Sequence, residues 1–389
     1  MSRSDGESDI RDPYSFDGHT EFRERIRRLL AQSVLPCAEE WERKAYIPAE
    51  GWRTLGKQGL LGLGHSGEDF LRSAVFLEEL GRTGYAGVRA AVGVHAYMAS
   101  SYLELFGTAE QKAKYLPRIR SGELVVALAI SEEGAGSDLS RLRTEALSAD
   151  SSGRYVNGCK QPVANGSRAD LFITLVRTRQ ATSERGLTGA SLILVDGRSP
   201  GVTRRPEPML GMRSADVCRI DFDQVRVEND QSIGRPDRAL MYLMKALEFE
   251  RLVAGILAVG GVHSCLALLG TFVREHRVGG APLAAKQVVK HRLADLVAEF
   301  EMVRHFAYRA AWRHSQGDLD SQTASILKLK ATELAVETAR VCVQYHGAQG
   351  YAEGSAAARH YRDAMAGTIA AGASELMRDM IFEGMSYEP

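Results

Sequence analysis

Hydrophobic residues follow a helical spacing in the first part of the chain and again in the last. Phe22, Ile26, Leu29 and Leu30 recur at i, i+4, i+7 and i+8, so they share one face of a helix. Helical segments continue to about residue 122. Three longer helices are predicted at residues 242–273, 284–315 and 322–345, lengths that suit a helix bundle.

The middle of the chain has a different pattern, because its apolar runs are short and rich in β-branched residues. Cys218, Ile220 and Phe222 alternate with charged residues, which is typical of a half-buried strand. Strands are predicted at residues 124–130, 154–160, 170–178, 191–195 and 218–227. Since no helix-length segment separates them, we expect an antiparallel sheet, as a barrel or a sandwich.

These patterns predict an α+β protein that is mostly α. A mobile tail at residues 1–18 precedes an N-terminal helical domain at 19–122, a middle antiparallel β domain at 123–230 and a C-terminal four-helix bundle at 231–389. Residues 252–273 carry no Asp, Glu, Lys or Arg and are long enough for a membrane span. Their Ala- and Gly-rich composition favours the buried centre of the bundle instead, so we expect no membrane partner.

Composition excludes several classes of protein. The 49 basic and 49 acidic side chains balance, which argues against nucleic acid as the main partner. The five cysteines form no C-x-x-C pair, so neither a disulfide framework nor a metal site is expected. The first twelve residues are polar and charged and lack the apolar core of a signal peptide, and we therefore expect a cytoplasmic location.

A glycine-rich segment follows the first predicted strand. Gly134 and Gly136 would let the backbone approach a ligand closely, and Ser131 and Ser137 supply hydroxyls. Residues 129–138, AISEEGAGSD, resemble a signature of the acyl-CoA dehydrogenase family of flavoproteins. Further runs resemble other motifs of this family in the same order, at residues 158–170, 210–227, 344–351, 361–364 and 372–378.

The resemblance implies a fold and an activity. The family fold is an N-terminal helical domain, a middle β domain and a C-terminal four-helix bundle, and its cofactor is FAD. The implied reaction is the α,β-dehydrogenation of an acyl thioester: a base removes the α proton and a hydride passes from the β carbon to flavin N5. The acyl group would be carried by CoA or by an acyl carrier protein. Electron-transfer flavoprotein or oxygen would accept the electrons.

The resemblance also implies which residue is the base. Many members carry the carboxylate just before the glycine of the last motif, where this chain has Ala371 before Gly372. An isovaleryl- and long-chain-type subgroup carries it on a bundle helix before an arginine. Glu250, which precedes Arg251, is therefore the expected catalytic base. The alternative is a glutamate at a helix N-terminus, favoured by the helix dipole, with Arg251 as its surface partner.

The family motifs place further residues at the ligands. Arg251, Gly372 and Ser137 would contact the substrate. FAD would be bound by Ser131, Gly136, Ser137, Ala164, Arg274, Arg277, Gln287, Gln344 and Gly347. Members are commonly homodimers or homotetramers in which a neighbouring subunit helps to bind the flavin, and the same assembly is expected here.

Four positions depart from the family at the flavin. Pro162 replaces an aromatic residue that covers the flavin, and Ala164 replaces a Thr or Ser whose hydroxyl reaches N5. His276 replaces an arginine that binds the diphosphate, and Gly279 replaces a phenylalanine. The sequence therefore leaves two alternatives open: a flavin-dependent monooxygenase, and a non-redox thioester-binding relative in a natural-product pathway.

Overall fold

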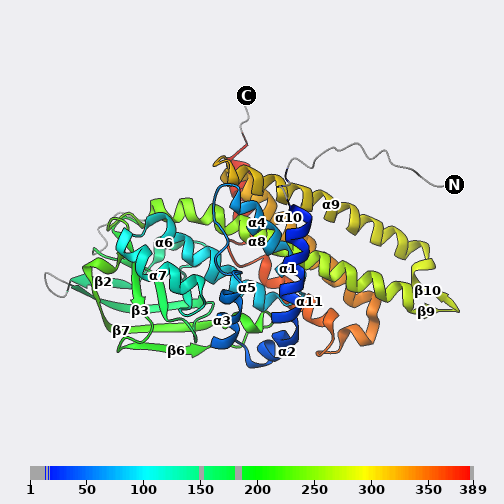
Figure 1. Cartoon of the computed structure of the whole chain (residues 1–389), viewed down its shortest axis with the longest axis horizontal. Coiled ribbons are helices and arrows are strands. Elements are labelled where there is room, and N and C mark those ends of the chain that lie inside the picture. The colour runs from blue at the N-terminus through cyan, green and yellow to red at the C-terminus, as the bar shows by residue number, and fades with distance from the viewer. Residues whose placement is uncertain (1–13, 15, 17, 149–152, 180–185, 386–389) are drawn as a thin grey trace.

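The computed structural model describes residues 14, 16, 18–148, 153–179 and 186–385. Most of the tail predicted at residues 1–18 lies outside these ranges. In the described part, N-terminal helices, a middle sheet and C-terminal helices follow one another along the chain (Figure 1). The protein is 59% helical, and the predicted fold class is confirmed.

The N-terminal region consists of short helices. Their order is α1 (His19–Ser33), α2 (Leu35–Lys44), α3 (Ala49–Lys57), α4 (Asp69–Gly81), α5 (Ala86–Gly93), the π-helical turn η1 (Val94–Ala99), α6 (Ser100–Phe106) and α7 (Ala109–Arg120). α7 begins with a capping box, in which the Thr108 hydroxyl accepts from the Gln111 N–H and the Gln111 side chain accepts from the Thr108 N–H. This box satisfies two backbone donors that the first turn leaves open.

One eight-stranded sheet forms the middle region. Its strands are β1 (Val126–Ala129), β2 (Glu145–Ser148), β3 (Gly153–Val163), β4 (Leu171–Arg177), β5 (Ala190–Asp196), β6 (Val202–Pro206), β7 (Cys218–Glu228) and β8 (Ser232–Ile233). Their order is β6-β7-β3-β2-β4-β5-β8, and β1 pairs with β4. Most neighbours are antiparallel, as predicted, but β4 pairs parallel with both β1 and β2. This correction concerns strand direction, which local alternation does not encode.

Long helices form the C-terminal region. They are α8 (Ala239–Glu275), α9 (Gln287–Ser315), α10 (Ser321–Tyr351), α11 (Ala356–Gly367) and α12 (Ser374–Glu383). A hairpin of β9 (Arg277–Val278) and β10 (Ala281–Pro282) joins α8 to α9 at the far tip of the molecule (Figure 1). By length and composition α8 could cross a membrane, yet 67% of its most apolar 18 residues are buried inside the protein.

One core unites the two helical regions. It contains Phe70 and Phe76 of α4, Leu252 and Ile256 of α8 and Leu327 of α10. A second core packs α6, α7 and the start of α8 against β4 and β5. Consequently the beginning of α8 lies where the helical regions and the sheet meet.

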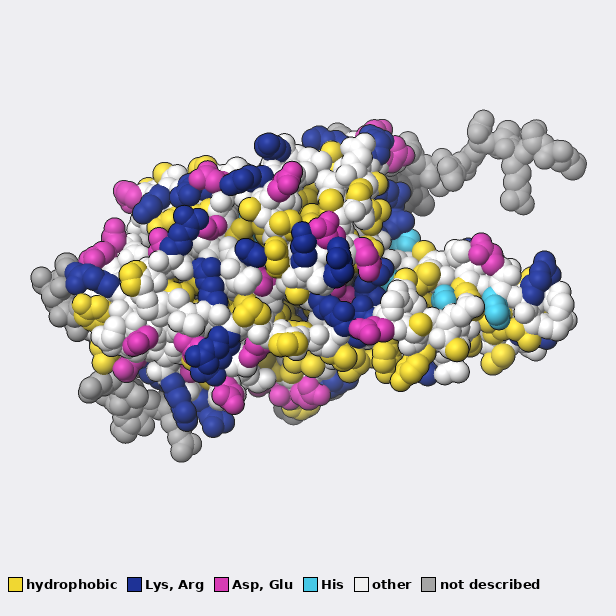
Figure 2. All heavy atoms as spheres, turned by 90° about the horizontal axis from the view of Figure 1, so that it is seen from below, with side chains coloured by type: hydrophobic (Ala, Val, Ile, Leu, Met, Phe, Trp, Pro, Cys, Tyr) yellow, Lys and Arg dark blue, Asp and Glu magenta, His cyan; other side chains and the backbone are white. Residues whose placement is uncertain are grey.

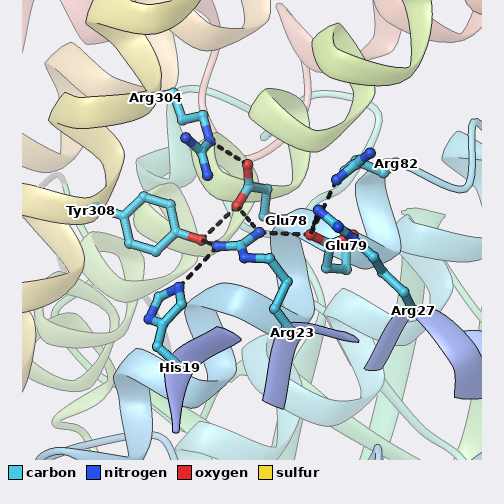
Figure 3. A network of polar contacts seen from close by, with 8 residues as sticks. All are labelled: His19, Arg23, Arg27, Glu78, Glu79, Arg82, Arg304 and Tyr308. Carbon is cyan, nitrogen blue, oxygen red and sulfur yellow. Dashed lines mark hydrogen bonds and ion pairs between the residues drawn. The ribbon is translucent and has the colours of Figure 1, made fainter. Parts of the chain in front are cut away.

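A buried ion-pair network fastens α1 and α9 to α4 (Figure 3). Glu78 of α4 accepts from Arg23 of α1 at 2.7 Å, and from Arg304 at 2.6 Å and Tyr308 at 2.5 Å, both on α9. Burial alone would raise the pKa of Glu78, but the two guanidinium groups outweigh it and lower the pKa to about 2. Glu78 is therefore a permanent anion at physiological pH.

Candidate active site

Glu250 lies about three turns into α8, at the junction of the helical regions with the sheet. Its exposed fraction is 6%, and that of Arg251 is 4%. The helix-dipole alternative required a glutamate at a helix start with a surface arginine beside it. The structure excludes that alternative. Both residues lie about three turns from the helix start, and both side chains are buried in the protein.

The Glu250 carboxyl has one hydrogen-bond donor among the described residues. The hydroxyl of Tyr102, on α6, donates to its Oε1 at 2.8 Å. Burial raises the pKa of Glu250 to about 7, although the Tyr102 hydrogen bond and the Arg251 charge both act to lower it. A carboxyl with this pKa can accept a proton near neutral pH and is suited to general-base chemistry.

Two buried cations lie beneath the loop that precedes α12. Lys328 of α10 donates to the carbonyl oxygen of Gly372. The Nε of Arg251 would lie 4.0 Å from a Cβ added to Gly372, and its Nη1 donates to Ser321 at 3.2 Å. Burial, together with the nearby Arg251 charge, lowers the pKa of Lys328 to about 8. The structure thus brings together two predicted substrate residues, Gly372 and Arg251, the latter adjacent to Glu250 in the chain.

The glycine-rich segment forms an open loop after β1. An added Cβ at Gly134 or Gly136 would meet no atom within 4 Å. Ser131 is half-buried and Ser137 is exposed. The Ser131 carbonyl accepts from the backbone N–H of Gln161 at 2.9 Å, so this loop lies beside the segment that contains Pro162 and Ala164.

A buried ion pair anchors this loop. Lys160 of β3 donates to Glu132 at 2.9 Å and to the Ile130 carbonyl at 3.0 Å. Glu132 also accepts from the backbone N–H groups of Arg143 at 2.8 Å and Thr144 at 2.9 Å. Burial lowers the pKa of Lys160 to about 8 against the opposing charge of Glu132. Neither residue was predicted as part of the site, and both support the loop backbone.

The other predicted FAD residues lie at the opposite end of the helical region. Along α8, 24 residues separate Glu250 from Arg274, which corresponds to about 36 Å. At this end lie Arg274, Arg277, Gln287, Gln344 and Gly347, and all five are exposed. The predicted FAD residues therefore form two distant groups in one chain.

The residues that are present fit a flavin nucleotide. In the first group, the open glycine faces and the hydroxyls of Ser131 and Ser137 can approach a ring and a ribityl chain. In the second, exposed guanidinium and amide groups suit a diphosphate. Gly347 (φ 59°) interrupts α10 with its added Cβ position open, which leaves the backbone accessible. Pro162 and Ala164 supply neither a stacking ring nor a hydroxyl.

Tyr102 and Lys328 are the main site residues that sequence reasoning missed. Each contacts a residue distant in the chain, and neither belongs to a motif that drew attention. The contacts of η1 and α6 with α8, which bring Tyr102 to Glu250, appear only in the structure. Among the described residues, no group of three His, Cys, Asp or Glu side chains could hold a metal ion.

Comparisons with known proteins cover nearly the whole chain. Residues 17–123, 127–225 and 240–386 match the N-terminal, middle and C-terminal domains of the acyl-CoA dehydrogenase family. The chain is 33% identical over 371 residues to the mitochondrial long-chain specific acyl-CoA dehydrogenase of Rattus norvegicus, covering 93% of this chain and 85% of that protein.

Solved structures agree with these matches. The acyl-CoA dehydrogenase of Geobacillus kaustophilus has a TM-score of 0.90 and 32% identity, with 96% of this chain and all of that chain covered. The prolyl acyl carrier protein oxidase AnaB has a TM-score of 0.87 and 26% identity, with 94% of this chain and 98% of that chain covered.

Fold, site and comparisons together define an oxidoreductase that acts on CH–CH groups, a flavin-dependent dehydrogenase of acyl thioesters. The chain belongs to the acyl-CoA dehydrogenase family. The predicted cofactor, FAD, is confirmed at the level of this family.

Proposed function

We propose that the protein oxidises an acyl thioester to its 2,3-enoyl form with Glu250 as the base. The observation that carries this proposal is the buried Glu250 carboxyl, whose pKa burial raises to about 7. Proton abstraction breaks the Cα–H bond and transfers the proton to the carboxylate. The Cα–Cβ double bond forms as the Cβ–H bond breaks. When bound, FAD supplies the acceptor for the hydride that leaves Cβ.

The residues around Glu250 orient this chemistry. Lys328 holds the Gly372 carbonyl and thereby fixes the loop that precedes α12. Arg251 provides a positive charge beside the carboxylate, which favours its ionised form before the reaction. Burial keeps water away from the base, so the carboxylate retains its affinity for the substrate proton.

The test is flavin reduction without oxygen by the substituted enzyme. We expect Glu250→Gln to retain its fold and its FAD but to reduce flavin at least 100-fold more slowly when an acyl-CoA is added, because a positioned base contributes about 10²–10⁴ in rate. The measurement is the loss of the visible flavin band in a stopped-flow spectrometer.

Glu248→Gln is the matched control, since Glu248 is a half-buried glutamate two positions before Glu250 on the same helix. It should reduce flavin at close to the unsubstituted rate. Full reduction in the Glu250 variant would remove Glu250 as the base. Working without oxygen also separates dehydrogenation from the monooxygenase alternative, which needs oxygen.

We propose acyl-CoA as the first substrate to test and an acyl carrier protein as the second. The similarity to long-chain specific acyl-CoA dehydrogenase supports the former, and that to prolyl acyl carrier protein oxidase supports the latter. Both thioesters end in the same phosphopantetheine arm, so one acyl group presented on each carrier would show which carrier the protein prefers. Electron-transfer flavoprotein and oxygen are the two acceptors to compare.

We infer that the complete FAD site needs a second copy of the chain. Two observations support this inference. The second group of predicted FAD residues lies at the end of α8 that is about 36 Å from Glu250 along the helix, and the projecting end of the helical region exposes hydrophobic side chains (Figure 2). Val288 is 72% exposed and Tyr351 is 83% exposed. A homodimer, or a homotetramer built from such dimers, would cover these side chains. It would also bring the first group of FAD residues of one chain next to the second group of its partner.

A further inference from the structure

Tyr102 holds one oxygen of the Glu250 carboxyl. Its hydroxyl donates to Oε1 at 2.8 Å, and the exposed fraction of the tyrosine is 0%. The two residues are 148 positions apart in the chain, so the contact joins α6 to α8. Oε2 accepts from no donor in the described part of the chain.

The backbone before Tyr102 is an unusual one. The π-helical turn η1 separates α5 from α6. Turns of this kind are rare in proteins, and those that occur are often found at functional sites. Side chains donate hydrogen bonds to backbone carbonyl oxygens of this turn. The Ala96 carbonyl accepts from Ser100 and from His65, each at 2.7 Å, and the Met98 carbonyl accepts from Ser101 at 2.8 Å. These hydrogen bonds fix the start of α6, and with it the direction of the Tyr102 side chain.

The hydroxyl of Tyr102 can act only as a donor in this environment. Burial and the neighbouring Glu250 carboxylate raise the pKa of Tyr102 well above its ordinary value, so the phenol stays protonated throughout the working pH range. A donor to a carboxylate stabilises the ionised form. Tyr102 thus both orients the carboxyl and counteracts its desolvation.

We propose that Tyr102 is a positioning residue for the dehydrogenation: by holding Oε1 of Glu250 it directs Oε2 to the substrate proton and sets the proton affinity of the base. This inference rests on the proposed function of Glu250. Tyr102 itself exchanges no proton, because its hydrogen remains bonded to the phenol oxygen while the Cα proton moves to Oε2.

Few charged groups compete with Tyr102 in setting this affinity. Among the residues that the structure describes, Arg251, the next residue on α8, is the one charged group that acts on Glu250. Lys328 of α10 acts on Arg251 and donates to Gly372. Removal of the Tyr102 hydroxyl would therefore leave the carboxylate with Arg251 alone as a stabilising partner, and its pKa would rise.

The experiment is the pH dependence of flavin reduction in the FAD-bound Tyr102→Phe variant, with substrate and without oxygen. We expect the rising limb of the second-order rate constant for flavin reduction by the substrate to move up by about one pH unit, the effect of losing one hydrogen bond to a charged group. At pH 6 the variant should then be roughly tenfold slower than the unsubstituted enzyme, and at pH 9 the two should nearly agree.

Tyr97→Phe is the matched control. Tyr97, on η1, is buried like Tyr102, but its hydroxyl makes no hydrogen bond to Glu250. The pH dependence of flavin reduction in the Tyr97 variant should match that of the unsubstituted enzyme. Unfolding midpoint and FAD content are measured for both variants, so that a defect in folding is recognised separately from a shifted profile.

The outcomes separate this inference from the function on which it rests. An unmoved limb in Tyr102→Phe, or an equal loss of rate at every pH, overturns the role of Tyr102 even if Glu250→Gln is inactive. Full flavin reduction in Glu250→Gln overturns the base itself. A shifted limb in Tyr102→Phe together with an inactive Glu250→Gln supports both.

Discussion

Single residues show how the site works without a carboxylate at position 371. Ala371 has a left-handed backbone (φ 53°) and directly precedes Gly372 (φ 96°), whose carbonyl is held by Lys328. The loop is thus fixed by a buried cation through its backbone and needs no acidic side chain. The base that we propose is instead Glu250, whose direction is fixed by a helix and by Tyr102.

His276 is the residue where cofactor affinity can be tested most directly. It is exposed at the end of α8, beside Arg274 and Arg277, in the position where the family carries a diphosphate-binding arginine. We predict that His276→Arg tightens FAD binding roughly tenfold at pH 8, because a guanidinium keeps its charge and can bind phosphate with two donors. Titration of the apoprotein with FAD, followed by flavin fluorescence, measures the Kd.

His305→Arg provides the control for charge alone, since His305 is exposed on the middle of α9, away from the predicted FAD residues. Its FAD affinity should equal that of the unsubstituted protein. If the His276 variant binds FAD no better than this control, the exposed end of α8 does not bind the diphosphate.

How far the site could be predicted depends on where each residue's partner lies. Glu250 could be found because a motif and the alanine at position 371 pointed to it. Tyr102 could not, since its importance comes from a hydrogen bond across 148 positions. The roles of Lys160 and Glu132 were missed for a similar reason: they are charged residues on a strand and a loop, and only burial reveals them as a structural pair.

The packing of α1 and α9 on α4 depends on the ion-pair network around Glu78. We predict that Glu78→Gln lowers the free energy of unfolding by about 3 kcal/mol at pH 7, because it leaves Arg23 and Arg304 without a buried anion. The pKa of Glu78 is lower in the folded protein, about 2, than its ordinary 4.5. Its contribution to stability is therefore present above pH 4.5 and is lost as the pH falls toward 2.

Urea denaturation at pH 7 and at pH 3 checks both parts of this prediction. The difference in the free energy of unfolding between the unsubstituted protein and the Glu78 variant should be smaller at pH 3 than at pH 7. Glu24→Gln serves as the control, because Glu24 forms an exposed ion pair with Arg28 at 3.9 Å, and such pairs contribute little. A variant of Glu78 as stable as the Glu24 control at pH 7 would mean that the network does not fasten α1 and α9 to α4.

The long elements were predictable and the short ones were not. The predicted helices at 242–273, 284–315 and 322–345 lie within or nearly within α8, α9 and α10, because their apolar spacing persists over many turns. β2, β6 and β8 were missed: β2 and β8 have four and two residues, and β6 is largely exposed, so none shows clear alternation. The parallel pairing of β1 depends on which strand lies beside it, which local sequence does not record.

At the scale of the whole molecule, the two groups of predicted FAD residues make the proposed second subunit testable. We predict that Val288→Glu, at the start of α9, weakens self-association and reduces FAD retention together, since a buried carboxylate in an apolar contact is costly. Light scattering gives the mass in solution, and the ratio of flavin to protein absorbance gives the FAD content.

Leu35→Glu on α2 introduces the same charge at another exposed apolar position and should change neither quantity. FAD retained in full by a monomeric Val288 variant would show that one chain suffices. An unchanged mass would place the contact between subunits elsewhere.

The separation of the proposed base from the loop at residues 370–373 has a consequence for redesign. In relatives with the carboxylate on this loop, a library that varies the loop discards most of its clones by removing the base. In this chain Glu250 belongs to a rigid helix, and the loop contributes mainly backbone through Gly372. Side chains at 369 and 370 are thus free to be randomised in a search for new acyl specificities while every clone retains the proposed proton acceptor, whereas the left-handed backbone of Ala371 restricts what can replace it.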